Sequence, residues 1–144
     1  MLGALEIEQG NLIQAQVYMQ EGLLIARQLG DSDQICTLLI NLGVVASRQG
    51  KNAQAKLYCQ EGLGLARQIG HREKICSVLM GLGDLFVEEG NYIQAEVCLQ
   101  EGLELAQRIG HREWMSMLLL NLGMTARKQG HYNQAVFTGK PYSG

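Results

Sequence analysis

The residues best suited to chemistry are cysteines and histidines, because thiolates and imidazoles are common nucleophiles and metal ligands. They are Cys36, Cys59, Cys76, Cys98, His71, His111 and His131. No two cysteines form a CxxC pair and no histidine stands at ligand spacing from one, so the pattern does not favour a zinc site. We expect no catalytic residue, no metal and no cofactor. We interpret the cysteines as buried, reduced thiols of a cytoplasmic protein.

Two glycine-rich stretches resemble phosphate-binding loops, GLGLA from Gly62 and GLGDLF from Gly81. A phosphate-binding loop needs a preceding strand and lies at the start of a helix. Both stretches instead lie within apolar helical patterns, so we do not expect nucleotide binding. Trp114 is a candidate aromatic contact for a partner, but we favour a ring that lies on its own loop.

Composition narrows the class of protein and of partner. The 144 residues carry a net charge of -2, are 47% hydrophobic and include one proline, Pro141. So few helix breakers predict helix throughout. The charge gives no reason to expect nucleic acid as a partner, because binding phosphate needs a basic surface. No apolar run approaches the roughly 20 residues of a membrane span, and the first ten residues, MLGALEIEQG, lack the basic-then-apolar layout of a signal peptide, so we expect no membrane partner.

The elements that carry these residues repeat every 40 positions. Four sets of markers keep this period: the glycines at 10, 50, 90 and 130, those at 30, 70 and 110, the Leu-Gly pairs at 2, 42, 82 and 122, and the alanines at 15, 55, 95 and 135. The period predicts units at about 1–33, 34–73, 74–113 and 114–138, followed by an irregular tail, 139–144. A complete unit contains two amphipathic helices, for example 33–49 and 53–69. We therefore expect eight helices, with the first and last shortened.

The stretch from Leu38 to Ala66, LLINLGVVASRQGKNAQAKLYCQEGLGLA, resembles a tetratricopeptide repeat. The family's signature positions are matched by Leu39, Leu42, Gly43, Ala46, Gly50 and Ala55. The period is 40 rather than the usual 34, and the proline that usually closes the second helix is absent. With these two departures, the sequence resembles the long-repeat subclass, which includes Pins-type adaptors, kinesin light chains and sensor arrays of bacterial signalling ATPases. It is most similar to the bacterial arrays. The resemblance implies an all-α, right-handed solenoid of antiparallel helix pairs, with the first and last of about four repeats incomplete.

Three glycines recur in the middle of the second helix of each unit, at Gly22, Gly62 and Gly102. Each costs about 1 kcal/mol relative to alanine in a helix. The family has a small residue at this position, so we interpret these glycines as a means of close helix packing.

The resemblance also implies that the first helix of each unit lines a concave ligand groove. Its expected residues are Ile40, Asn41, Val44, Ser47, Arg48, Met80, Asp84, Glu88, Leu120, Asn121, Met124, Arg127 and Lys128. Asn41 and Asn121 match an asparagine that holds a ligand's backbone in relatives, whereas Gly81 interrupts this series. The aliphatic side chains favour an apolar peptide or an amphipathic helix over a charged C-terminus. The alternative, that these side chains only pack against neighbouring helices, stays open.

The expected function is a non-enzymatic scaffold that binds a protein or peptide segment. The alternative is a sensor or regulatory array of a larger signalling ATPase or protease. Neither end carries the polar cap that repeat arrays need, so we expect a fragment of a longer protein. Uncapped ends also predict self-association or exchange of terminal helices.

Overall fold

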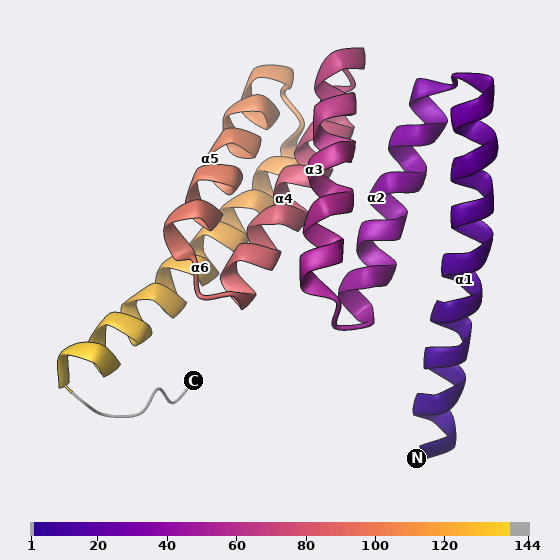
Figure 1. Ribbon diagram of the computed structural model, residues 1–144. Helices are drawn as coiled ribbons and strands as arrows, with labels where there is room; N and C mark the ends of the chain where they lie inside the picture. The colour runs from indigo at the N-terminus through magenta and orange to yellow at the C-terminus, as the bar shows by residue number, and fades with distance from the viewer. Residues whose placement is uncertain (1, 139–144) are drawn as a thin grey trace.

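In the computed structural model, the described backbone covers residues 2–138, and the described side chains cover 8–136. This part of the chain forms six helices, which lie as a row of antiparallel neighbours (Figure 1). They are α1 (Leu2–Leu29), α2 (Ser32–Arg48), α3 (Asn52–Ile69), α4 (Arg72–Glu88), α5 (Tyr92–Ile109) and α6 (Arg112–Thr138). The expected all-α solenoid of helix pairs is confirmed. The expected tail, 139–144, lies outside the described residues.

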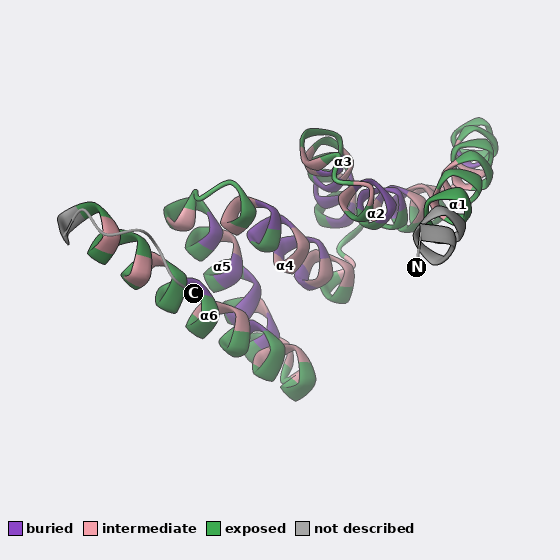
Figure 2. Ribbon diagram, turned by 90° about the horizontal axis from the view of Figure 1, so that it is seen from below, coloured by how far each residue is buried: buried purple, intermediate pink, exposed green. Residues whose placement is uncertain are grey.

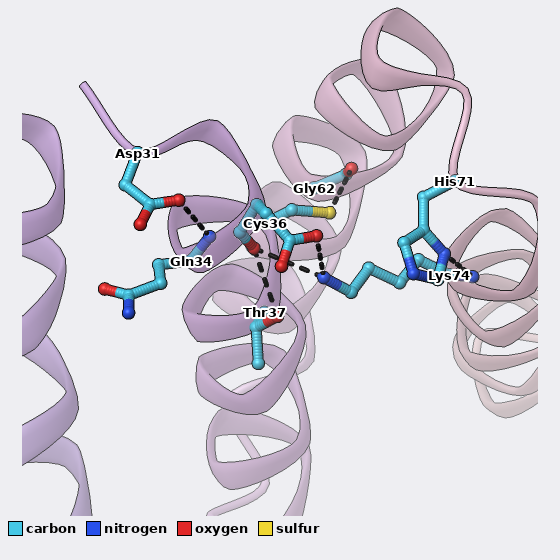
Figure 3. Close-up of polar contacts among 8 residues, drawn as sticks. Asp31, Gln34, Cys36, Thr37, Gly62, His71 and Lys74 are labelled. Atoms are coloured by element: carbon cyan, nitrogen blue, oxygen red, sulfur yellow. Dashed lines mark hydrogen bonds and ion pairs between the residues drawn. The ribbon is translucent and has the colours of Figure 1, made fainter.

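The first helix of each of the last three units (α2, α4 and α6) begins with a side-chain cap at the same repeat position. Asp31 Oδ1 accepts a hydrogen bond from the Gln34 amide at 3.1 Å, and α2 begins there. In the next unit His71 Nδ1 accepts from the Lys74 amide at 3.2 Å (Figure 3). His111 Nδ1 accepts from the amide of residue 114 at 3.3 Å. Two of the three histidines therefore satisfy helix ends, which explains their recurrence without any catalytic role.

In the two complete units, 34–73 and 74–113, the helices end at glycines with positive φ. Gly70 and Gly110 cap α3 and α5 in the left-handed conformation, with φ of 72° and 68°. Gly50 and Gly90 reverse the chain between the two helices of a unit, with φ of 76° and 78°. Other residues rarely adopt this backbone conformation, so glycine is required at these turns.

The expectation of eight helices is wrong, because the chain does not reverse at Gly10 or Gly130. Both glycines lie inside continuous helices, α1 and α6, although their sequence context repeats that of Gly50. A reversal breaks the helical hydrogen-bond ladder, and that cost is offset only when the two segments bury apolar surface on each other. The described segments 2–9 and 131–138 are half the length of an inner helix and offer less surface to bury. At both glycines, the uninterrupted helix is therefore lower in free energy than a helix pair joined by a turn.

The stacking order determines which helices line which face. The backbones of α2 and α4 approach each other, as do those of α4 and α6, whereas α3 and α5 stay more than 8 Å apart. The helices α2, α4 and α6 therefore form the inner, concave side, and α1, α3 and α5 the outer side. Buried residues lie between the two layers (Figure 2). The largest fully buried side chains include Leu39, Leu42, Leu79, Leu99 and Leu118.

The closest helix approaches involve glycines of the inner helices. A Cβ on Gly83 would lie 2.8 Å from Cγ of Leu99, and one on Gly43 would lie 2.9 Å from Sγ of Cys59. Gly62 is also buried, as expected, but a Cβ there would meet Cβ of Leu39 at 3.5 Å, an ordinary contact. A methyl group therefore fits at Gly62, whereas one on Gly102 would lie 3.1 Å from Cδ2 of Leu118. The outer-helix glycines do lie at helix contacts, but the strictest requirement for glycine is at Gly43 and Gly83.

Candidate interaction surface

The thirteen side chains expected in the groove belong to α2, α4 and α6, the helices of the concave side. None of the thirteen is buried. Val44, Leu120 and Met124 are the most open of the apolar members, with 48%, 63% and 50% of their surface exposed. Ile40 and Met80 are half-buried and pack against the two hydrophobic cores. These two side chains therefore also serve the packing role that the sequence left open.

A hydrogen bond between neighbouring inner helices crosses this surface. Asn121 Nδ2 donates to Asp84 Oδ1 at 3.2 Å and so ties α6 to α4. Although Asp84 is exposed in part, the neighbouring helices remove some of the water around its carboxyl, and this desolvation raises its pKa above the ordinary value; nearby Glu88 adds to the rise and Lys128 opposes it. No described residue hydrogen-bonds the side chain of Asn41, so its amide can both donate to and accept from a ligand backbone.

The charged members of the set differ in their surroundings. Glu88 Oε2 accepts from Asn52 Nδ2 at 2.9 Å, so this carboxylate is engaged at the start of α3. Arg48, Arg127 and Lys128 are exposed and sit close to the apolar members on their own helices. The concave side therefore offers apolar side chains flanked by cations.

Ion pairs between neighbouring units were missed by the sequence reasoning. Arg27 pairs with Glu61 at 2.9 Å, and Arg67 pairs with Glu101, on the outer helices. Lys74 Nζ lies 2.6 Å from Asp33 Oδ1 and joins α4 to α2 (Figure 3), which lowers the pKa of the Asp33 carboxyl. The recurrence of Arg27 and Glu61 after 40 residues was the available signal. These pairs are exposed at least in part, so each adds little to stability.

The thiols are not set up for nucleophilic chemistry. All four cysteines are free, three are buried and Cys98 is half-buried. Burial raises the pKa of Cys59 to about 11, and it is also the main cause of raised pKa values at the other three. Cys36 Sγ donates to the Gly62 carbonyl at 3.4 Å, and Cys76 Sγ to the Gly102 carbonyl at 3.6 Å. The buried thiols therefore join the two helices of a unit.

Other kinds of site find little support in the described part of the chain. Across it, no three His, Cys, Asp or Glu side chains come together in a way that could hold a metal ion. None of the described helices has a stretch apolar and long enough to cross a bilayer. A hollow of about 400 Å³ on α5 is lined by that helix alone, so it is an open surface rather than an enclosed pocket. Trp114 is half-buried beside His111, with ring centroids 6.2 Å apart, and lies near its own loop.

Comparison with known proteins agrees with this architecture. The family model described as tetratricopeptide repeat matches residues 1–68 and 74–140. The solved structure of BtubC (BKLC) from P. vanneervenii is similar, with a TM-score of 0.75 and 22% sequence identity. The match covers 88% of this chain and 53% of BtubC, so the chain spans about half the length of that protein. This likeness shows the fold alone, and comparison with curated proteins gives no match.

Both the fold and the family model have consequences for function. Repeats of this kind are typically protein-interaction scaffolds and are generally non-catalytic. The 40-residue period, the helix pairs and the family match, which covers nearly all residues, lead to one assignment. The chain belongs to the tetratricopeptide repeat family.

Proposed function

We propose that the chain is a scaffold that binds a segment of another protein on the concave side of α2, α4 and α6. The observation that carries this proposal is the open apolar surface of Val44, Leu120 and Met124 on the helices that face inward. Exposed apolar side chains rimmed by polar residues can mark interaction sites, and these three lie at the two ends of the concave side, on α2 and α6.

The chemistry of the surface favours an amphipathic helix or an apolar extended peptide as the ligand. The apolar face of such a segment would cover Leu120 and Met124, and methionine adapts its shape to varied partners. The free amide of Asn41 suits a backbone group of the ligand. Arg127 and Lys128 suit acidic residues that flank the apolar positions.

The proposal can be tested by selecting ligands from displayed libraries of helical and extended peptides. Binding of the selected peptides is then measured with the double variant Leu120→Asp, Met124→Asp. The control is Ile93→Asp, Val97→Asp, which changes two apolar residues of similar exposure on the outer helix α5. We expect at least a tenfold loss of affinity for the inner variant, since about 1.4 kcal/mol corresponds to that factor. Equal losses in both variants, or a loss in the control alone, would refute the proposal.

A further inference from the structure

One side of α6 lacks the helix that covers the equivalent side of α2 and α4. Leu119 is 54% exposed, whereas Leu39 and Leu79, at the same repeat position, are 1% exposed. A Cβ on Gly123 would meet nothing within 4 Å, in contrast to its equivalents in α2 and α4. The opposite side of α6 is closed, since Leu118 is fully buried against α5. We call the open side the α6 slot; its residues are Leu119, Gly123 and Ala126. Leu122 lies at its edge and packs in part against the buried cluster of α5.

The helix α1, in turn, lacks the first helix that covers the equivalent side of α3 and α5. Ala15 and Met19 are half-exposed. The alanines at the same repeat position in α3 and α5 are fully buried, and the residues equivalent to Met19 are 7% and 0% exposed. Tyr18 is 65% exposed. The far side of α1 is closed against α2, where Ala26 is 1% exposed. We call the open side the α1 face; its residues are Ala15, Tyr18 and Met19.

We propose that these two surfaces bind each other between copies of the chain, with α1 of one copy in the α6 slot of the next. Residues 112–128 stand at the repeat positions of a first helix, and residues 12–29 at those of a second helix. Together they make one complete unit of the kind formed by α4 and α5. Met19 would then cover Gly123 as Leu99 covers Gly83.

The pairing must join different copies, because α1 and α6 lie at opposite ends of the row (Figure 1). It is a head-to-tail contact, which leaves one α1 face and one α6 slot free after each addition and so produces open chains or rings. The residues involved are distinct from Leu120 and Met124 on the concave side. The inference therefore stands independently of the proposed function.

The uninterrupted course of α1 and α6 fits the same pairing. Gly10 and Gly130 are separated by three repeat periods, so an antiparallel pair in the normal register places them side by side. Beyond these glycines, 131–138 of one copy would run beside 2–9 of the other. Those segments carry the sequence marks of a second and a first helix, Ala135 and the Leu2-Gly3 pair. On each side of the two glycines, a first-helix segment of one copy would therefore lie beside a second-helix segment of the other. This is the pairing that α4 and α5 already show within the chain.

The first test is the mass of the chain in solution, measured by sedimentation from micromolar to millimolar concentration. We expect the mass to rise with concentration for the unmodified chain and for Gly64→Glu. The latter is a control at an exposed glycine of α3 that has nothing within 4 Å. Gly123→Glu should stay monomeric, because it places a carboxylate in the slot. A monomeric unmodified chain, or unchanged association of Gly123→Glu with unchanged helicity by circular dichroism, would overturn the proposal.

The second test distinguishes head-to-tail pairing from other contacts by disulfide formation between chains. One chain carries Met19→Cys and the other Gly123→Cys, both with Cys98→Ser. At the equivalent pair a Cβ on Gly43 would lie 2.9 Å from Cys59 Sγ, a distance that suits a disulfide. We expect rapid cross-linking in the mixture and slow cross-linking in either chain alone. Faster cross-linking of Gly123→Cys with itself would show that two α6 slots pair and would contradict the head-to-tail arrangement.

Discussion

Replacement of Gly83 by alanine should destabilise the protein, although alanine is the better helix former. The added Cβ would lie 2.8 Å from both Cγ and Cδ2 of Leu99. The Leu99 side chain is completely buried, so it cannot move out into solvent to relieve the contact. The helices α4 and α5 would have to separate, or Leu99 would have to adopt a strained rotamer.

The magnitude follows from two opposing effects. Alanine gains about 1 kcal/mol of helix propensity over glycine. Overpacking a buried site costs about 1–3 kcal/mol. The net expectation for Gly83→Ala is a loss of up to about 2 kcal/mol in the free energy of unfolding. Gly123→Ala, at the same repeat position in α6, meets nothing within 4 Å and should gain about 1 kcal/mol.

Urea unfolding followed by circular dichroism measures both variants against the unmodified chain, at a concentration low enough to avoid association. The two variants should differ by about 1–3 kcal/mol, with Gly83→Ala the less stable. If Gly83→Ala is stabilised as much as Gly123→Ala, the close approach of α4 and α5 at this glycine is refuted.

Three further predictions concern a helix cap, a carboxyl group and a thiol. His71→Asp should raise the unfolding free energy by about 0.5–1 kcal/mol, because a carboxylate caps the N-terminus of α4 better than imidazole does; lower stability in a thermal melt would contradict this. The raised pKa of Asp84 means that the native state binds its proton more tightly than the unfolded state does. That contribution to stability is present below the ordinary pKa and is lost as the pH rises through the raised pKa. Asp84→Asn should therefore be more stable than the unmodified chain at neutral pH, and the difference in unfolding free energy should shrink on acidification. A difference that does not change with pH in urea titrations would refute this. Cys98, the one thiol among the four that is not buried, should react first with a thiol reagent, and Cys98→Ser should remove the fast phase; a fast phase that persists would place the open thiol elsewhere.

The sequence was sufficient to predict the inner units, because their signals agree at several levels. The apolar periodicity, the Leu42-Gly43 pair and the turn glycine at 50 all indicate the same helix pair. The observed bounds, Ser32–Arg48 and Asn52–Ile69, differ from the expected ranges by one residue at most.

The first and last units could not be predicted in the same way, because the same local sequence signals stand beside different neighbouring segments. Gly10 and Gly130 repeat the context of Gly50, yet the chain stays helical at both. Whether such a glycine turns depends on how much apolar surface the following segment can bury, and this is a property of the neighbours rather than of the local sequence.

The candidate groove could also be predicted only in part from the sequence. Its positions follow from the repeat register, and the structure leaves all of them accessible, but their occupation by a ligand stays a prediction. The hydrogen bond from Asn121 to Asp84 depends on how two helices from different units stack, so no local pattern indicated it. Asn41, at the same repeat position as Asn121, has no such partner among the described side chains.

The most direct test of the account is the location of a bound peptide. Backbone amide NMR shifts can be recorded while a peptide selected from the displayed libraries is titrated into the chain. We predict that the largest changes fall on α2, α4 and α6 and centre on Asn41, Val44 and Met124. Changes confined to the outer helices α3 and α5 would contradict the assignment of the concave side as the binding surface.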